Sequence, residues 1–486
     1  MEFDKHKDKI MNDKNILNGL MRQNSVVSDF CIISLSDSYK CGHHNMYVKG
    51  TQRVHSYLES RKGAQFKETV FFGLQFITKR YLTGVVVTRE NIEAAAALYR
   101  LHFGNENLFN RAGWEYILNV RGGKLPVIIR AVPEGTPVPI DNVLMTVENT
   151  DDECFWLTNY LETILTHVWY GSTVATLSRE VKKVLKHYYD RTADSDAGLA
   201  FGLQDFGCRG VSCMDQAGYG GCAHLINFLG TDTVPAMPFA AMYYGASFDG
   251  LGYSVPATEH SIMTALGAEG EYDLVQDLLN EYPTGILSVV GDSYNIFDMA
   301  KALGTRFKAQ ILARDGVFVL RPDSGDPEEV MMELLNILWK LFGGTVNSKG
   351  FRVLPKQIRL LWGDGIDIRG IQNILGAMLV NGWSIENIAC FGMGGGLLQK
   401  VNRDTQRSAF KCSAQMRNNV WIDIQKNPLD QSKKSKAGRL KLIKVNGEYK
   451  TVRLEEPGED ILVTVFENGD ITKEWTFVEV RKNAAL

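Results

Sequence analysis

Four short apolar segments recur between residues 285 and 396, and each ends in polar or glycine-rich residues. They are Ile286–Val290, Val317–Leu320, Ile358–Trp362 and Ile388–Phe391. Strands that are apolar throughout are typical of parallel sheets buried on both faces, and the residues between these segments have a helical pattern. Successive βα units form a parallel sheet with right-handed crossovers. The region therefore predicts an α/β fold whose ligands bind at the carboxyl ends of the strands.

Two of the intervening helices have recognisable starts. Asp326 can cap a helix whose first residue is Pro327, with Glu329 completing a capping box. Asp367 can cap the next helix, in which apolar residues recur from Ile371 at a spacing of three and four. These starts follow directly after predicted strands and support the βα pattern.

The flanking segments predict a second, β-rich structure. Before residue 150, short apolar runs surround a helical stretch over Arg89–His102, and residues 151–190 have apolar side chains at helical spacing. After residue 410, apolar and polar residues alternate, and Asn446-Gly447 and Asn468-Gly469 are hairpin turn sequences. This C-terminal module can complete an N-terminal α+β part. The predicted strands are Cys31–Leu35, Val54–Leu58, Val127–Val132, Trp421–Ile424, Leu440–Val445, Ile461–Phe466 and Thr476–Val480.

Composition excludes several classes of protein. The 486 residues carry a net charge of −3, which excludes a globally basic nucleic-acid binder but not a local basic site. The 8 cysteines form no CxxC pair, which excludes zinc-ribbon and thioredoxin motifs and is typical of reduced, buried, cytosolic thiols. No apolar run is long enough to span a membrane, and the charged N-terminus is not a secretory signal. We expect a cytoplasmic protein without a nucleic-acid or membrane partner.

The glycines are concentrated in two segments. Of 46 glycines, ten lie within residues 202–252 and nine within residues 363–396. Consecutive glycines at Gly394–Gly396 favour a backbone nest for phosphate, although close packing of a helix on a strand also requires glycine. The phosphate loop of the G-x-x-x-x-G-K-[ST] type is absent, and the glycine run lacks the last glycine of the dinucleotide fingerprint.

Aspartates end three of the predicted strands. Asp292, Asp323 and Asp364 can hold Mg²⁺ or ribose hydroxyls there, or can be ordinary helix caps and turn residues. Arg321 can offer a bidentate fork to phosphate, or can pair with Asp323. The Arg403–Lys444 region is locally basic, typical either of a solvated face or of an electrostatic funnel for an anion.

Two further residues have open roles. His260 can be a structural histidine or an acid–base or nucleophilic group. Phe206, between Asp205 and Gly207, can belong to the core or form an exposed stacking platform. From the residues alone we expect an α/β enzyme that binds a phosphorylated small ligand with Mg²⁺, and its reaction stays open.

The chain resembles the nicotinamide phosphoribosyltransferases of the type II phosphoribosyltransferase family from about Leu35 to Ala485. The motifs that carry the resemblance are Asp37–Lys40, Asp205–Ser212, Gly230–Thr233, Gly252–Ser261, Arg321–Gly325, Gly363–Gly365 and Gly394–Lys400. It implies an irregular parallel α/β barrel over residues 166–404. It also implies a mixed, β-rich α+β domain over 25–165, completed by the C-terminal segment 405–486, with a charged N-terminal extension over 1–24.

The resemblance also implies an activity. Phosphoribosyl pyrophosphate and nicotinamide would give nicotinamide mononucleotide and pyrophosphate, a step of NAD salvage, with Mg²⁺ and with ATP as co-substrate but no NAD(P) or flavin as redox cofactor. A homodimer with shared active sites is implied. Transfer to nicotinate, or a barrel enzyme acting on another sugar phosphate, are the alternatives.

Residue roles follow from the same resemblance. Phe206, Arg209, Asp232 and Tyr39 of the partner subunit would bind nicotinamide. His260, phosphorylated by ATP, Asp323, which is also a candidate Mg²⁺ ligand, and Arg321 would be catalytic. The residues expected at the ribose and phosphates are Arg61, Ser254, Ser288, Asp292, Gly363, Asp364, Gly394, Gly395, Arg403, Lys411, Lys426 and Lys433.

Overall fold

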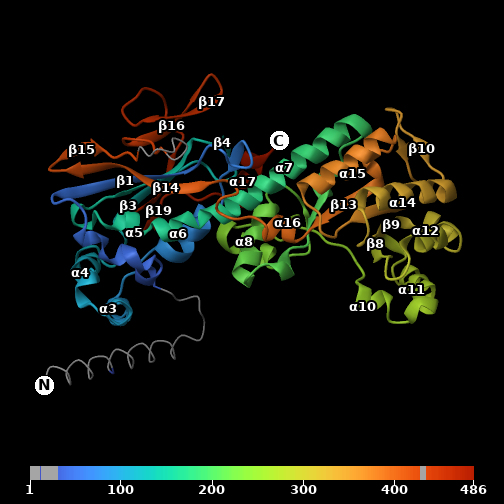
Figure 1. Ribbon diagram of the computed structural model, residues 1–486, viewed down its shortest axis with the longest axis horizontal. Coiled ribbons are helices and arrows are strands. Elements are labelled where there is room, and N and C mark those ends of the chain that lie inside the picture. The colour runs from blue at the N-terminus through green and yellow to red at the C-terminus, as the bar shows by residue number, and fades with distance from the viewer. Residues whose placement is uncertain (1–10, 12–30, 427–433) are drawn as a thin grey trace. The chain divides into compact units, whose positions relative to one another are not determined.

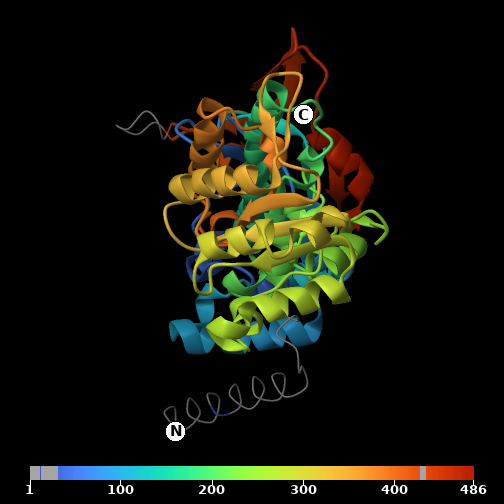
Figure 2. The same cartoon turned by 90° about the vertical axis from the view of Figure 1, so that its right-hand side faces the viewer.

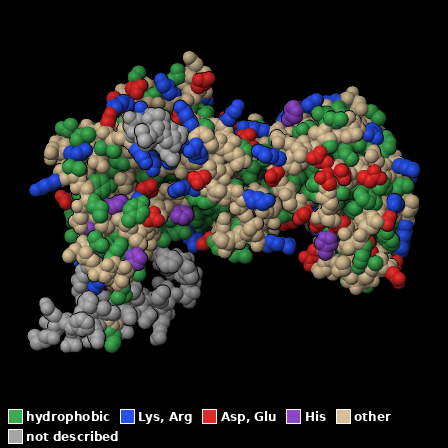
Figure 3. Space-filling view, viewed as in Figure 1, with side chains coloured by type: hydrophobic (Ala, Val, Ile, Leu, Met, Phe, Trp, Pro, Cys, Tyr) green, Lys and Arg blue, Asp and Glu red, His purple; other side chains and the backbone are tan. Residues whose placement is uncertain are grey.

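The computed structural model describes Met11 and residues 31–426 and 434–486, and it divides into two compact units (Figure 1). The first, which we call the sheet unit, comprises Met1–Thr173 and Asn402–Asn483. The second, which we call the barrel unit, comprises Val174–Val401 and Ala484–Leu486. On the face drawn in Figure 3, basic and acidic side chains are interspersed over each unit, in line with the near balance of 53 basic and 56 acidic residues.

The sheet unit contains a seven-stranded antiparallel sheet in the order β15-β14-β1-β5-β3-β18-β19. Strands β2 and β4, and β16 and β17, form two small additional sheets. The strands are β1 Thr51–Ser60, β2 Glu68–Val70, β3 Val127–Ala131, β4 Pro137–Pro139, β5 Val143–Asn149, β14 Ser408–Arg417, β15 Val420–Asp423, β16 Leu440–Val445, β17 Glu448–Arg453, β18 Val463–Glu467 and β19 Asp470–Ile471. N-terminal and C-terminal strands thus share one sheet, as predicted.

The hairpin sequences of the C-terminal segment form the predicted turns. Asn446 and Gly447 both have positive φ, as do Asn468 and Gly469, which is the conformation of a type I′ turn. The helices of the unit are α2 Leu74–Ile77, α3 Arg89–Phe103, α4 Arg111–Val120, α5 Leu157–Tyr160, α6 Glu162–Thr166 and α17 Phe477–Ala484. The helical pattern over residues 151–190 therefore forms three helices, α5, α6 and α7, the last of which spans Val168–Thr192.

Two strand predictions were wrong. Thr476–Val480 begins helix α17, because Thr476 and Glu479 form a capping box: the Glu479 N–H donates to Thr476 Oγ1 at 3.2 Å, and the Thr476 N–H donates to Glu479 Oε2 at 2.7 Å. Cys31–Leu35 forms a short 3₁₀ turn over Ile32–Ser34, whose Ile33 N–H donates to Cys31 Sγ. Local hydrogen bonds to side chains outweigh the apolar pattern in both segments.

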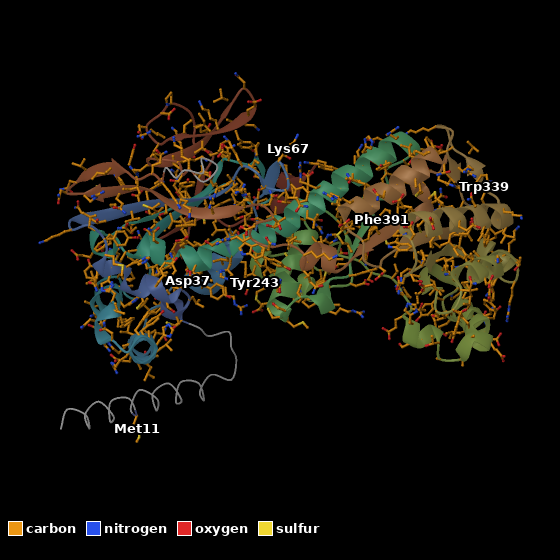
Figure 4. The ribbon with its side chains drawn as sticks, viewed as in Figure 1. Met11, Asp37, Lys67, Tyr243, Trp339 and Phe391 are labelled. Atoms are coloured by element: carbon orange, nitrogen blue, oxygen red, sulfur yellow. The ribbon has the colours of Figure 1, made fainter. Side chains whose placement is uncertain are left out.

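The barrel unit contains a six-stranded parallel sheet in the order β7-β6-β13-β12-β9-β8. Its strands are β6 Leu203–Asp205, β7 Gly230–Thr231, β8 Thr284–Val290, β9 Asp315–Arg321, β12 Ile358–Trp362 and β13 Ile388–Met393, with a separate hairpin of β10 Thr345–Val346 and β11 Arg352–Val353. The four strands predicted between residues 285 and 396 are confirmed. Figure 4 shows Phe391 on β13 inside the unit and Trp339 farther out on helix α14, which spans Pro327–Phe342.

A short segment between β7 and β8 closes the sheet into an irregular barrel. Tyr253 pairs with Gly230 on β7, and Ala257 pairs with Ser288 on β8, both in parallel. The Thr231 N–H donates to Tyr253 O at 3.0 Å, and the Thr258 N–H donates to Ser288 O at 3.0 Å. Residues 253–258 therefore form a strand-like segment that closes the barrel between β7 and β8. The predicted parallel barrel is confirmed.

Helices surround the strands of this unit (Figures 1 and 2). Asp326 Oδ1 accepts hydrogen bonds from the Glu328 and Glu329 N–H groups at 3.0 Å, and Asp367 caps α15 in the same way, so both predicted helix starts are confirmed. The helices are α7 Val168–Thr192, α8 Met214–His224, α9 Ala236–Tyr244, α10 His260–Met263, α11 Gly267–Glu281, α12 Ile296–Gly304, α13 Lys308–Leu312, α14 Pro327–Phe342, α15 Ile368–Val380 and α16 Gly395–Leu398.

None of the helices in the described part of the chain combines the length and the apolar composition that crossing a membrane requires. All eight cysteines are free. Cys41, Cys154 and Cys222 are buried, whereas Cys213 is exposed, so the expectation of buried thiols does not hold for that residue.

The cap of α14 allows a stability prediction. Asp326→Ala removes the acceptor of two helix N–H groups and should lower the free energy of unfolding by about 1 kcal/mol. Asp326→Ser, which keeps an acceptor, should lose less than half of that. Urea unfolding followed by fluorescence measures both variants, and equal stability of Asp326→Ala and the parent chain would contradict the assignment.

Candidate active site

A cavity of about 880 Å³ lies where the carboxyl ends of the barrel strands meet. Four strands contribute the residue that directly follows them: Phe206 follows β6, Asp232 follows β7, Gly363 follows β12 and Gly394 follows β13. The full lining is Phe206, Gly207, Cys208, Arg209, Gly210, Met214, Asp232, Glu259, His260, Ser261, Arg321, Asp323, Gly363, Asp364, Gly365, Ile366, Gly394, Gly395, Gly396, Gln399 and Lys400. Motifs that are separate in the sequence therefore lie together at the carboxyl-terminal end of the barrel.

Phe206 lies against glycines of two neighbouring strands. A Cβ atom added to Gly392 would lie 2.0 Å from Phe206 Cε2, and one added to Gly363 would lie 3.1 Å from the same atom. The Phe206 N–H also donates to Met393 O at 3.1 Å. Any larger residue at position 392 would displace the ring, so glycine lets the ring rest on the strand ends while the side chain stays half-buried at the cavity.

Close packing also requires the glycines of the run Gly394–Gly396, which follows β13. A Cβ on Gly396 would meet Ile366 O at 2.7 Å, and one on Gly394 would meet Phe206 O at 3.2 Å. At Gly395 the added atom would meet the Gln399 side chain at 3.0 Å. All three glycines line the cavity, so close packing and ligand access coincide there.

Asp232 is held by contacts to one of its carboxylate oxygens. Gln204 Nε2 donates to Asp232 Oδ1 at 2.9 Å, and Ser254 Oγ donates to the same atom at 2.5 Å. The Asp232 side chain is exposed at the cavity, where exposed Arg209 also lies. The arrangement presents a negative acceptor beside the ring of Phe206.

His260 begins helix α10 and faces two carboxylates. Its Nε2 lies 3.6 Å from Asp292 Oδ1 and 3.7 Å from Asp323 Oδ2, and its Nδ1 lies 3.2 Å from Ser293 Oγ. Almost half of the His260 side chain is exposed, whereas Asp292 is buried, with Oδ2 accepting from the Asp323 N–H. The imidazole thus lies beside the buried Asp292 carboxylate and is accessible from the cavity.

Arg321 and Asp323 form an ion pair at the end of β9. Arg321 Nε lies 3.1 Å from Asp323 Oδ1, and Arg321 Nη2 lies 3.3 Å from Asp323 Oδ2. Burial raises the pKa of Asp323, and the positive charge of Arg321 opposes that shift. Both side chains line the cavity, so Arg321 offers its remaining donors to a ligand while Asp323 orients it.

A second cavity of about 320 Å³ reaches into the barrel interior. Phe206, Asp232 and Arg321 line both cavities, which therefore meet at these side chains. Ser254 and Ser288 line only the smaller cavity, and Ser288 Oγ has no hydrogen-bond partner among the described residues. Asp292 lines neither.

The remaining predicted residues belong to the sheet unit or lie outside the described residues, as Lys433 does. Lys411 lies on β14 and Arg61 directly follows β1. Burial lowers the pKa of Lys411, the negative charge of Glu162 opposes that shift, and the nearby charges of Arg61, Lys426 and Arg403 lower the pKa further. No carboxylate among the described residues lies within 4 Å of Arg61, Arg403 or Lys411, which makes this cationic cluster a candidate anion site. Tyr39 is 61% exposed.

Sequence reasoning missed several lining residues. Lys400 and Gln399 follow the glycine run and reach the larger cavity, and Gln204 reaches Asp232. A polar Gln204 within the short strand Leu203–Asp205 was the available signal, because a strand of a packed barrel is otherwise apolar.

Family models match most of the chain. Residues 201–470 match the nicotinate phosphoribosyltransferase (NAPRTase) family, and residues 31–129 match the N-terminal domain of nicotinamide phosphoribosyltransferase. The chain is 45% identical over 462 residues to a nicotinamide phosphoribosyltransferase of Xanthomonas campestris, covering 92% of this chain and 97% of that one. It is 32% identical over 488 residues to one of Acinetobacter baylyi, covering 92% and 96%.

Solved structures agree on the fold. A nicotinate-nucleotide pyrophosphorylase of Pyrococcus furiosus has a TM-score of 0.57 at 15% identity, with 93% of this chain and 94% of that chain covered. Human nicotinic acid phosphoribosyltransferase has a TM-score of 0.53 at 15% identity, with 93% and 92% covered.

Buried Asp205, at the end of β6, allows a pH prediction. Burial raises its pKa to about 6, despite a hydrogen bond from the Gly207 N–H to Oδ1 at 2.7 Å. The folded chain therefore binds more protons than the unfolded chain between about pH 4 and 6, so stability falls as the pH rises through this range and then levels off. The contribution is on the order of 3 kcal/mol.

Asp205→Asn should remove this slope. Urea unfolding between about pH 4 and 7 measures it, with Asp249→Asn, an exposed aspartate of the same unit, as the matched control. Equal slopes in Asp205→Asn and the parent chain would contradict the role of Asp205.

Proposed function

The chain belongs to the nicotinamide phosphoribosyltransferases, and on this basis we propose that it transfers the 5-phosphoribosyl group from phosphoribosyl pyrophosphate to nicotinamide. The products are nicotinamide mononucleotide and pyrophosphate, which makes it an enzyme of NAD salvage. The observation that carries the proposal is the meeting of Phe206, Asp232 and Arg321 between the two cavities, because a flat apolar ring, an acceptor and a cation match the base and the phosphates.

Nicotinamide binds at Phe206 in this proposal. The pyridine stacks on the free face of the Phe206 ring, Tyr39 of the partner subunit covers its other face, and Arg209 lies beside it. Asp232 accepts a hydrogen bond from the carboxamide N–H. A carboxylate at this position attracts an amide donor and repels the carboxylate of nicotinate, which favours nicotinamide as the substrate.

Phosphoribosyl pyrophosphate occupies the larger cavity. Gly363, Asp364, Gly394 and Gly395 line the ribose and phosphate path, and Arg321 binds phosphate oxygens with the donors that Asp323 leaves free. We assign Ser254 to the base end, because it donates to Asp232, and Asp292 to the support of His260. Ser288 remains a proposal for the ribose end of the smaller cavity.

The transfer needs no protein nucleophile. The ribose C1–O bond breaks as pyrophosphate leaves, and the pyridine nitrogen attacks C1 from the opposite face. Arg321 and the cationic cluster offset the charge that develops on the departing pyrophosphate, and Phe206 holds the ring so that its nitrogen faces C1. Positioning and electrostatics therefore supply the catalysis, in line with the lack of a Ser–His–Asp motif in the sequence.

Magnesium fits this site as a partner of the pyrophosphate. No three metal-binding side chains converge among the described residues, and Mg²⁺ is commonly held by one or two carboxylates together with substrate phosphates. Among the described residues nothing donates a hydrogen bond to the buried Asp292 Oδ1, and Asp323 beside it lines the cavity, so Asp323 is the candidate ligand. When bound, the ion would neutralise charge on the pyrophosphate.

A homodimer would complete the site. Tyr39 would reach the base of a neighbouring subunit, and the cationic cluster of Arg61, Arg403, Lys411 and Lys426 would reach its phosphates, as the family resemblance also implies for Lys433. Exposed apolar side chains on and beside α8 and α9 support an interface, since they are costly to leave in water. They are Met214, Val234, Met242 and Phe248. We propose that the enzyme is cytoplasmic.

A direct assay tests the function. The purified chain is supplied with phosphoribosyl pyrophosphate, Mg²⁺ and either nicotinamide or nicotinate, and both mononucleotides are quantified. Nicotinamide mononucleotide as the main product supports the proposal. Product from nicotinate alone, or turnover of a sugar phosphate without a pyridine base, refutes it.

Asp232→Ala should relax the choice of base. Loss of the charged acceptor should lower kcat/KM for nicotinamide by about ten- to hundredfold, and the ratio of nicotinate to nicotinamide turnover should rise. Asp249→Ala, at an exposed aspartate of the same unit, is the control. Unchanged discrimination in Asp232→Ala would count against the role of this carboxylate.

His260→Ala tests the coupling to ATP. We propose that ATP phosphorylates His260 and that turnover of the phosphohistidine drives the transfer toward product. The variant should keep its basal rate within about twofold, because no bond to ribose involves the imidazole, and should lose stimulation by ATP. His187→Ala, at an exposed histidine of α7, is the control. Full ATP stimulation without His260 would overturn the coupling.

A further inference from the structure

The two oxygens of the Asp232 carboxylate have different surroundings. Oδ1 accepts from Gln204 Nε2 at 2.9 Å and from Ser254 Oγ at 2.5 Å. No hydrogen bond from a described residue reaches Oδ2. One oxygen is therefore saturated by the protein, and the other is left for a donor in the cavity.

Gln204 occupies a space that the absence of a side chain at Gly230 provides. In the parallel sheet it pairs with Gly392 on β13 and with Gly230 on β7. A Cβ atom on Gly230 would lie 2.2 Å from Gln204 Oε1, so even alanine there would push the amide out of its position. The side chain lies half-buried along the strand and reaches the smaller cavity behind Asp232.

The two donors restrict how the carboxylate can turn. The terminal torsion of an aspartate is broad, so an exposed carboxylate without partners samples many orientations. Two donors, one from β6 and one from the closing segment, hold Oδ1. They fix the orientation of the carboxylate and therefore the position of Oδ2. Because both contacts are donors, they leave an acceptor, and no donor, for the ligand.

We propose that Gln204 is a positioning residue that sets base selectivity by fixing Asp232 with Oδ2 toward the carboxamide N–H of nicotinamide. This inference rests on the proposed function, because it assumes that Asp232 meets the base. Nicotinamide brings a donor that matches Oδ2, whereas nicotinate brings only acceptors and a negative charge. Gln204 touches no reacting atom, and its effect passes through Asp232.

Gln204→Leu is the principal test, since leucine keeps the apolar bulk and removes the donor. The KM for nicotinamide should rise by about tenfold, because the Asp232 carboxylate that accepts the charged hydrogen bond is no longer held in one orientation. The ratio of nicotinate to nicotinamide kcat/KM should rise, while kcat with saturating nicotinamide and the KM for phosphoribosyl pyrophosphate stay within about twofold. A general structural defect would alter all of these parameters.

Two further variants keep the inference testable if Gln204→Leu folds poorly. Gly230→Ala displaces the Gln204 amide without removing it and should reproduce the change in selectivity. Ser254→Ala removes the second donor and should shift selectivity in the same direction. Gln276→Leu is the matched control, because the amide of Gln276 on α11 donates to the side chains of Asn280 and Gln310, away from both cavities.

The outcomes separate the inference from the proposed function. A parent chain that makes no nicotinamide mononucleotide refutes the proposed function itself. A selective parent chain whose Gln204→Leu and Gly230→Ala variants keep the same nicotinamide KM and base ratio refutes only the role of Gln204. A nicotinamide-specific loss in both variants, with the control unchanged, supports it.

Discussion

Closure of the barrel by residues 253–258 is the constraint on which the site depends. This segment pairs with β7 through Tyr253 and with β8 through Ala257, so a sheet of six parallel strands becomes a closed ring. In a closed parallel ring all carboxyl ends lie at one rim, which brings Phe206, Asp232, Arg321 and Asp364 to a common cavity. The same segment carries Ser254 to Asp232 and leads directly into His260.

Small residues create the room in which the larger functional side chains lie. The ring of Phe206 rests where a Cβ of Gly392 would be, and the amide of Gln204 rests against Gly230. Glycine concentration in this chain therefore reflects the packing of functional side chains as much as direct ligand contact. Carboxylates that are held by donors or by Arg321 then provide fixed charges around the reacting groups, as a reaction that depends on positioning and electrostatics requires.

Much of the barrel could be predicted from the sequence, because its strands are apolar throughout and its helices start at Asp326 and Asp367. The closing segment could not, since Tyr253–Thr258 has no continuous apolar run and contains a proline, and it pairs with its neighbours only through isolated bridges. Thr476–Val480 alternates like a strand, yet the capping box of Thr476 and Glu479 makes it a helix. Motifs identified Phe206, Asp232 and His260 as candidate site residues. The contact between Gln204 and Asp232 depends instead on the pairing of β6 with β7, which are separate in the sequence.

The account centres on a base that stacks on Phe206 and donates to Asp232 Oδ2, and a crystal structure of the chain with nicotinamide tests this most directly. The account predicts the pyridine ring against Phe206 and the carboxamide nitrogen within hydrogen-bond distance of Asp232 Oδ2, while Gln204 and Ser254 still donate to Oδ1. Nicotinamide bound away from Phe206, or with its carboxamide turned from Asp232 toward Arg209 or Arg321, would contradict it.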